Sequence, residues 1–149
     1  MNEIARTFLR LRTQCEGGLI AYVAAGDPEL SYTPRIVDAL VEGGADIVEL
    51  GIPFSDPIAD GPTIQAATSR ALKAGTTPKK VLKIAEKIKG KNKIPVVILT
   101  YYNPIFRMGL DNFFESAGAC GVDGVIVPDL PVEEADEYKK FAETNGIDT

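Results

Sequence analysis

Residues 48–62 read VELGIPFSDPIADGP, and this stretch decides the fold class that the sequence predicts. It begins as a short apolar run that holds a single carboxylate, Glu49, and it continues as a long loop rich in Pro, Gly and Asp. Apolar runs that end at Pro and Gly are typical of buried strands followed by loops. In strand–helix folds that edge of the sheet is where ligands bind, so Glu49 and Asp60 are the first candidates for chemistry.

The composition indicates a globular domain with a substantial core, because 45% of the 149 residues are apolar and 25% are charged. The net charge of -5 argues against binding of nucleic acid or of anionic membranes. Eight lysines gather within residues 73–93, but they lie on a helical pattern and are interpreted as a solvated face.

Several kinds of protein and site are excluded by what the sequence lacks. No apolar run approaches the roughly 20 residues of a membrane span, and the N-terminus has no apolar core like that of a signal peptide. Cys15 and Cys120 form no metal-like pair, so free thiols and a cytoplasmic location are expected. The sequence has no histidine, which excludes histidine general bases and histidine metal ligands on this chain.

Hydrophobic periodicity and Pro/Gly punctuation predict one helix followed by repeated strand–helix units. Strands are predicted over residues 19–25, 46–50, 96–99 and 124–127, and Ile147 looks like the start of a fifth. Helices are predicted over residues 2–14, 62–74, 78–90 and 110–119, together with one from Pro131 to Asn145. A further helix ends at Gly43-Gly44 and is opened by either Asp27-Pro28 or Thr33-Pro34.

Repeated strand–helix units imply parallel strands joined by right-handed crossovers. Either an open doubly wound sheet or part of an eight-stranded barrel fits this pattern. No G-x-G-x-x-G motif follows the first strand and no Walker-type lysine motif occurs, so nucleotide-binding folds lose support. A full barrel needs about 250 residues. Residues 1–149 are therefore predicted to be the N-terminal half of a single (β/α)8 barrel domain, with about four strand–helix units after an N-terminal helix. Residues 44–48 (GADIV) are also faintly similar in sequence to residues 121–125 (GVDGV).

Glu49 and Asp60 each have a functional and a structural interpretation. Side chains alternate along a strand, so Glu49 shares a face with Ile47 and would lie at the barrel mouth if Ile47 points inward. A carboxylate there can act as an acid and base, although it could instead pair with a neighbouring Lys or Arg. Asp60 could serve in the chemistry, or it could be a turn or helix-capping residue.

Other polar residues at strand ends are weaker candidates. Asp27 and Asp56 are best explained as cap or turn residues. Asp129 could bind a ligand or cap the next helix, and capping is favoured. Tyr101 and Tyr102 could line an aromatic pocket, with core packing as a slightly favoured alternative.

The segment ELGIPFSDPIADGPTIQ at residues 49–65 resembles the signature of the tryptophan synthase alpha subunit family. The resemblance continues through AGDP at 25–28, YYNP at 101–104, GVDG at 121–124 and DLPVEE at 129–134. It covers essentially the whole chain but only the N-terminal part of the family's barrel. A fragment of the full subunit is therefore expected.

The resemblance implies a carbon–carbon lyase of tryptophan biosynthesis that cleaves indole-3-glycerol phosphate to indole and glyceraldehyde 3-phosphate without a cofactor or metal. It implies that Glu49 is the acid/base. It implies that Asp60 accepts a hydrogen bond from the indole N–H and stabilises the positive charge that develops there. Tyr22, Leu99 and Tyr101 match positions in the wall of the family's pocket.

The resemblance also implies a partner, the beta subunit, in an alpha2-beta2 tetramer. Pro53, Asp56, Asn103 and Pro131 resemble the surface that faces it. Two alternatives stay open from the sequence: a non-catalytic half-barrel that folds or dimerises, and another barrel enzyme acting on phosphorylated metabolites. The first is supported by the missing later strands, whose loops form the phosphate site in such barrels.

Overall fold

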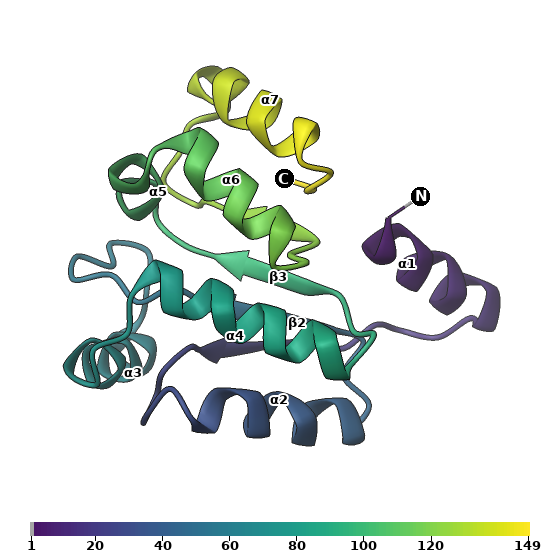
Figure 1. Cartoon of the computed structure of the whole chain (residues 1–149). Coiled ribbons are helices and arrows are strands. Elements are labelled where there is room, and N and C mark those ends of the chain that lie inside the picture. The colour runs from purple at the N-terminus through teal and green to yellow at the C-terminus, as the bar shows by residue number, and fades with distance from the viewer. Residues whose placement is uncertain (1) are drawn as a thin grey trace.

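Four strands pair in sequence order in the computed structural model, which describes residues 2–149 (Figure 1). They are β1 (Ile20–Ala24), β2 (Ile47–Gly51), β3 (Val96–Leu99) and β4 (Gly124–Ile126). Every neighbouring pair is parallel. A doubly wound sheet reverses its strand order at a switch point, whereas here the order never reverses. The arrangement therefore fits four consecutive strands of a barrel.

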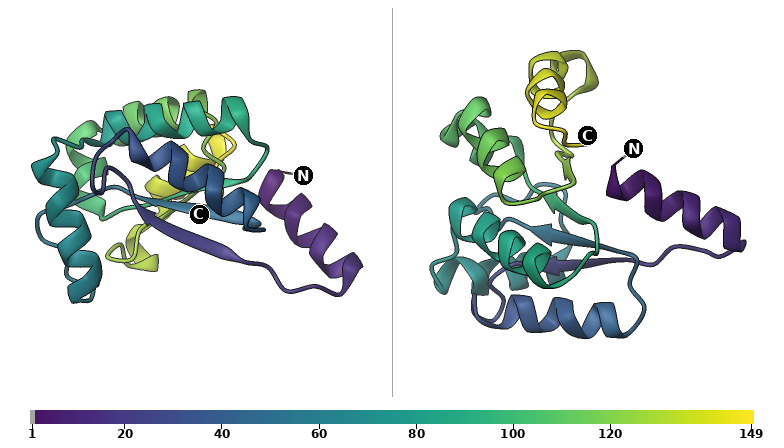
Figure 2. Two further views of the ribbon diagram at one scale, coloured as in Figure 1. Left: turned by 90° about the horizontal axis from the view of Figure 1, so that it is seen from below. Right: turned by 45° about the vertical axis from the view of Figure 1, so that its right-hand side comes forward.

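The helices are α1 (Glu3–Gln14), α2 (Tyr32–Glu42), α3 (Pro62–Lys73), α4 (Pro78–Lys91), α5 (Tyr102–Met108), α6 (Leu110–Ala119) and α7 (Asp136–Thr144), with a short 3-10 helix, η1 (Val132–Glu134). Figure 2 shows α2, α4, α6 and α7 side by side along one face of the sheet, with α1 set apart from them. We call the helix-covered face the outer face and the opposite one the inner face.

The core lies between the outer face and these helices. Val48, Leu50, Val96 and Ile98 point outward from adjacent strands and are fully buried. They pack in one cluster with Val81, Leu82, Ala85 and Ile88 of α4, the residues that the periodicity places on its buried side. Burial on this scale stabilises the fold by about 1.5–3 kcal/mol for each large aliphatic side chain.

The inner face is only partly covered. The side chains of Ile20 and Ile126 are 45% and 40% exposed, and Phe8 of α1 is 49% exposed beside them. A cavity of about 200 Å³ lies here, lined by side chains of α1 and of all four strands. Half of a barrel leaves its interior open in this way, because the strands that would close it come later in the barrel.

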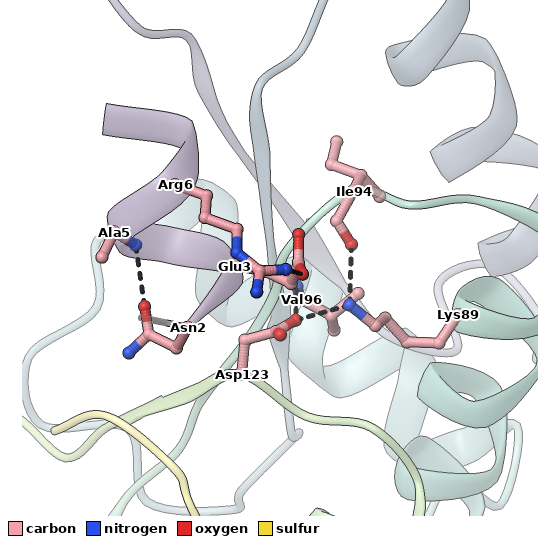
Figure 3. A network of polar contacts seen from close by, with 8 residues as sticks. All are labelled: Asn2, Glu3, Ala5, Arg6, Lys89, Ile94, Val96 and Asp123. Carbon is pink, nitrogen blue, oxygen red and sulfur yellow. Dashed lines mark hydrogen bonds and ion pairs between the residues drawn. The ribbon is translucent and has the colours of Figure 1, made fainter. Parts of the chain in front are cut away.

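The sequence similarity between residues 44–48 and 121–125 has a structural cause. The Asp46 carboxylate accepts a hydrogen bond from the Leu19 N–H at 3.0 Å, at the start of β1. The Asp123 carboxylate does the same for the Val96 N–H at 2.8 Å, at the start of β3. Figure 3 shows Lys89 reaching the same Asp123 carboxylate, at 2.9 Å. Each aspartate thus joins the start of its own strand to the start of the preceding one.

The structure confirms the predicted order of strands and helices, with three local differences. α5 was not predicted, because residues 100–104 were interpreted as a strand end. The predicted helix from Pro131 is instead the short helix η1 followed by α7, which begins at Asp136. α2 begins at Tyr32, close to Thr33-Pro34 and away from Asp27-Pro28.

The predicted fifth strand is present only as a single parallel bridge between Gly124 and Asp148. In the part of the chain that the structure describes, no helix is both long and apolar enough to cross a membrane.

Candidate functional site

Glu49 lies on the inner face near the C-terminal end of β2, between two neighbouring strands. The parallel register places it opposite Tyr22 of β1 and Val97 of β3. Ile47 and Glu49 both line the inner cavity, as the alternation of side chains predicts. None of the ion pairs formed within residues 2–149 involves Glu49, so it is not the strand-end partner of a Lys or Arg.

Gly51 lets the ring of Tyr22 cross the end of β2. A Cβ atom on Gly51 would lie 2.2 Å from the Tyr22 hydroxyl oxygen and 2.7 Å from its Cζ. Any side chain at this position would therefore push the tyrosine away. Burial raises the pKa of Tyr22 to about 12, and the charges of Asp60 and Glu49 and the neighbouring Tyr101 add to the effect. Tyr22 is consequently a neutral hydroxyl that lies close to both candidate carboxylates.

The loop that carries Asp60 is fastened to the end of β3 through Tyr101. The Ala59 N–H donates a hydrogen bond to the Tyr101 hydroxyl at 2.9 Å, and the rings of Phe54 and Tyr101 are 5.6 Å apart. Burial raises the pKa of Tyr101, and the Ala59 N–H opposes that rise. The charge of Asp60 and a side-chain hydrogen bond with Asp60 raise the pKa of Tyr101 further. Tyr101 is 3% exposed, so this anchor is fixed in the core.

Asp60 is not used as a helix cap. The N-cap residue of α3 is Gly61, and no side chain caps that helix. Gln65 instead donates to the backbone carbonyl of Asp60 at 2.8 Å. The capping interpretation of Asp60 is therefore wrong. Its carboxylate instead acts on Tyr101 through its charge and a side-chain hydrogen bond, and on Tyr22 through its charge.

The weaker candidates have structural partners. Arg70 donates two hydrogen bonds to Asp27, at 2.7 and 2.8 Å, so Asp27 forms an ion pair where a cap was expected. Asp56 accepts a hydrogen bond from Ser55 at 2.6 Å. The favoured expectation that Asp129 caps the helix after it is wrong. Its carboxylate accepts a hydrogen bond from the Tyr102 N–H at 2.9 Å and so caps the start of α5.

Of the predicted partner-facing residues, Asp56, Asn103 and Pro131 are exposed, whereas Pro53 is buried.

Sequence reasoning missed three exposed apolar side chains in the same segments. Ile58, Phe106 and Val132 are 81%, 65% and 72% exposed. Each follows the C-terminal end of a different strand, from β2 to β4. Exposed apolar residues gathered on one side of a protein mark interaction surfaces, and sequence alone gave no sign of their exposure.

Leu99 ends β3 opposite Gly51, on the inner face with Tyr22 and Glu49, and is half-buried. Residues 2–149 bring together no group of three or more Cys, Asp or Glu side chains that could hold a metal ion. The candidate site contains two carboxylates, two tyrosines and Leu99 near the C-terminal end of the strands, where barrel enzymes have their active sites.

Comparison with known proteins gives one family. A family model described as the tryptophan synthase alpha chain matches residues 8–149. The tryptophan synthase alpha chain of Geobacter sulfurreducens is 49% identical over 148 residues, which are 99% of this chain and 56% of that protein. The one from Methanosarcina barkeri is 51% identical over 146 residues, 98% of this chain and 55% of that protein. The chain thus spans about half the length of the curated relatives it matches.

Solved structures agree with the sequence matches. The crystal structure of tryptophan synthase subunit alpha from Legionella pneumophila has a TM-score of 0.96 and 40% identity, covering 99% of this chain and 56% of that one. A chain of the tryptophan synthase complex from Pyrococcus furiosus has a TM-score of 0.84 and 48% identity, covering 88% of this chain and 54% of that one. The predicted fold class, the N-terminal half of a (β/α)8 barrel, is confirmed by these matches.

Proposed function

Because the chain belongs to the tryptophan synthase alpha chain family, we propose that the protein carrying it cleaves indole-3-glycerol phosphate to indole and glyceraldehyde 3-phosphate. One observation carries the proposal: the charges of both Glu49 and Asp60 act on the same buried side chain, Tyr22, and neither carboxylate is used in an ion pair or a cap within residues 2–149. Residues 1–149 are then the N-terminal part of a single barrel domain.

The reaction is a retro-aldol cleavage, which needs an acid and a base near one another. Glu49 delivers a proton to C3 of the indole, and the ring becomes an iminium ion that can accept electrons. The proton of the side-chain hydroxyl is then removed, the carbon–carbon bond breaks, and its electron pair returns to the ring. The products are indole and an aldehyde. Glu49 serves as acid and then as base, because it ends on the inner face where the indole would lie.

Asp60 supports the same step by electrostatics. Its carboxylate accepts the hydrogen bond of the indole N–H and stabilises the positive charge that forms in the iminium ion. Groups placed in advance against a developing charge contribute about 3–4 kcal/mol in favourable sites. Tyr22, Leu99 and Tyr101 form the wall that holds the indole ring. The anchor between Ala59 and Tyr101 supports this role, since it fixes the residue next to Asp60.

The partner in this proposal is the beta subunit, in an alpha2-beta2 assembly. The solved structures from Pyrococcus furiosus are described as a tryptophan synthase complex and as an a2b2 complex. The exposed side chains of Ile58, Phe106 and Val132 support a partner surface together with Asp56, Asn103 and Pro131. Pro53 would support that surface from beneath, because it is buried. A cytoplasmic location remains part of the proposal.

The test uses a chimera in which residues 1–149 are followed by the C-terminal part of the Geobacter sulfurreducens relative. Release of indole from indole-3-glycerol phosphate is measured with and without a beta subunit. We expect release by the folded chimera. A chimera that folds and binds the beta subunit but releases no indole would contradict the proposal.

A non-catalytic half-barrel, the first alternative from the sequence, is not favoured by membership of the family. The same assay on the 149-residue chain alone tests that alternative for this chain. Membership of the family does not favour the other alternative, a different barrel enzyme of phosphorylated metabolites.

A further inference from the structure

The side chain of Tyr101 joins the core to the exposed loop between β2 and α3. Ile58 and Ala59 of this loop are exposed, whereas Tyr101 is only 3% exposed. The Ala59 N–H donates a hydrogen bond to the Tyr101 hydroxyl at 2.9 Å. Nearer the start of the loop, the ring centroids of Phe54 and Tyr101 are 5.6 Å apart. One buried side chain thus contacts the loop near both of its ends.

The backbone of Asp60 is held by hydrogen bonds on both sides. Its N–H donates to the Pro57 carbonyl at 3.2 Å, and its carbonyl accepts from the side-chain amide of Gln65 at 2.8 Å. The residue before it, Ala59, is held by Tyr101. The freedom that remains to Asp60 is the rotation of its side chain, so a contact with the carboxylate decides where its oxygen atoms point.

The Tyr101 hydroxyl supplies that contact. A phenol hydroxyl can donate one hydrogen bond while its oxygen accepts another. The oxygen of Tyr101 accepts from the Ala59 N–H, which leaves its proton for a second partner, and its side chain forms a hydrogen bond with Asp60. Within residues 2–149 the one other carboxylate that acts on Tyr101 is Asp129, and that carboxylate already accepts from the Tyr102 N–H. Burial raises the pKa of Tyr101, so the hydroxyl keeps its proton at neutral pH.

Tyr101 is itself fixed from the far side, by the end of β4. It is the N-cap residue of α5 and has an extended backbone conformation. The first residue of that helix, Tyr102, donates its N–H at 2.9 Å to the carboxylate of Asp129, which follows β4. The segment after β4 thus holds the start of α5, and Tyr101 at that start holds the loop after β2. Three successive strand ends are joined in this way.

We propose that Tyr101 is a positioning residue for Asp60: its hydroxyl accepts from the Ala59 N–H, donates to one oxygen of the Asp60 carboxylate, and leaves the other oxygen for the indole N–H. This inference rests on the proposed function, because it gives Asp60 the orientation that the indole needs. A carboxylate has two oxygen atoms and about four acceptor positions, so both hydrogen bonds can form together. Tyr101 then acts through Asp60 and is more than a wall of the pocket.

The first test is Tyr101→Phe in the chimera, which removes the hydroxyl and keeps the ring. We expect kcat to fall by about tenfold or more, the effect of losing a hydrogen bond to a charged group, with KM changed less than about threefold. Tyr138→Phe is the matched control. Tyr138 is 5% exposed, packs in the outer core and donates to the Val125 carbonyl at 2.9 Å, so this variant also loses a buried hydrogen bond. It should keep the full kcat.

Two outcomes of this test would overturn the inference. A rise in KM with kcat unchanged would show that Tyr101 is only a pocket wall. An equal fall of kcat in Tyr101→Phe and Tyr138→Phe would show a general effect of a lost buried hydrogen bond.

The second test does not depend on activity. Hydrogen exchange is measured over residues 54–60 of the ligand-free chimera. Tyr101→Phe leaves the Ala59 N–H without its acceptor, so exchange of this amide should become about tenfold faster or more. Tyr138→Phe should leave it unchanged. Equal protection of the Ala59 amide in Tyr101→Phe and in the unchanged chimera would overturn the inference.

The two levels of the account can fail separately. If no indole is released by the folded chimera, the proposed function fails, whatever Tyr101 does to the loop. If indole is released, and Tyr101→Phe turns over at the rate of the unchanged chimera, only the role of Tyr101 fails.

Discussion

At the scale of single residues, the aspartates of this chain divide by whether the fold occupies them. Asp46 and Asp123 join strand starts, Asp27 pairs with Arg70, and Asp129 caps a helix. The Asp60 carboxylate forms no ion pair and caps no helix within residues 2–149, and the Tyr101 hydroxyl is its hydrogen-bond neighbour. A loop carboxylate that is left without an ion pair or a cap, beside two buried tyrosines, fits a role in chemistry.

Asp46 gives a prediction about pH and stability. The Leu19 N–H and then Arg10 hold the pKa of Asp46 below its usual range in the folded chain. A carboxyl group with a lowered folded pKa stabilises the fold above its unfolded pKa of about 3.9, and this contribution is lost as the pH falls through the folded value. Asp46→Ala should lower the free energy of unfolding at pH 7 by about 1–2 kcal/mol, measured by urea denaturation.

The difference between Asp46→Ala and the unchanged chain should shrink as the pH falls below about 4, because the carboxyl group becomes protonated first in the unfolded chain and, at lower pH, in the folded chain as well. Asp46→Asn keeps an acceptor for the Leu19 N–H and should lose less stability at pH 7. A constant difference from pH 7 down to pH 3 would contradict this account of Asp46.

At the scale of elements, α5 depends on a residue far away in the sequence. Its first residue, Tyr102, donates its N–H to the carboxylate of Asp129, which lies 27 residues downstream. The helix has no capping side chain of its own. Caps of this kind contribute about 0.5–2 kcal/mol. Asp129→Ala should therefore speed hydrogen exchange along α5.

Asp129→Asn is the matched control for that prediction, since its amide oxygen can still accept from the Tyr102 N–H. It should leave the protection of α5 close to that of the unchanged chain. Equal exchange in α5 for Asp129→Ala and the unchanged chain would show that the cap is not what holds this helix.

The same elements show what the sequence can and cannot predict. Strands β2 and β3 were predicted because runs of Val, Ile and Leu between Pro and Gly are local signals. α5 was missed because its cap comes from a distant loop and YYNP has the local pattern of a turn. Glu49 was predicted from strand alternation. The approach of Tyr22 to Gly51 was not, because it depends on the register between β1 and β2.

At the scale of the whole molecule, two apolar surfaces remain uncovered. The first is the inner face of the sheet, and the second contains Ile58, Phe106 and Val132 at the C-terminal ends of the strands. The first is the interior of the barrel in longer members of the family. The second lies on the loop that carries Asp60, on α5 and on η1, and this placement supports the proposed partner surface.

Ile58 tests the partner surface, because it is the most exposed large apolar side chain among those of residues 2–149. Ile58→Glu in the chimera should weaken binding of a beta subunit by about tenfold or more, since a charge would enter an apolar contact. Binding is measured by calorimetry. Leu9→Glu is the control, because Leu9 is 53% exposed on α1 and lies outside the proposed surface. Equal affinity for both variants would contradict the placement of the interface.

Release of indole by Glu49→Gln tests the central claim most directly, that the carboxylate on β2 carries the cleavage. The variant is compared in the chimera with Glu42→Gln, which changes an exposed glutamate at the end of α2. Loss of a general acid–base group lowers rates by about 100- to 10,000-fold, so Glu49→Gln should fall by that amount and Glu42→Gln should keep the full rate. Turnover by a folded Glu49→Gln variant at the rate of the unchanged chimera would contradict the account.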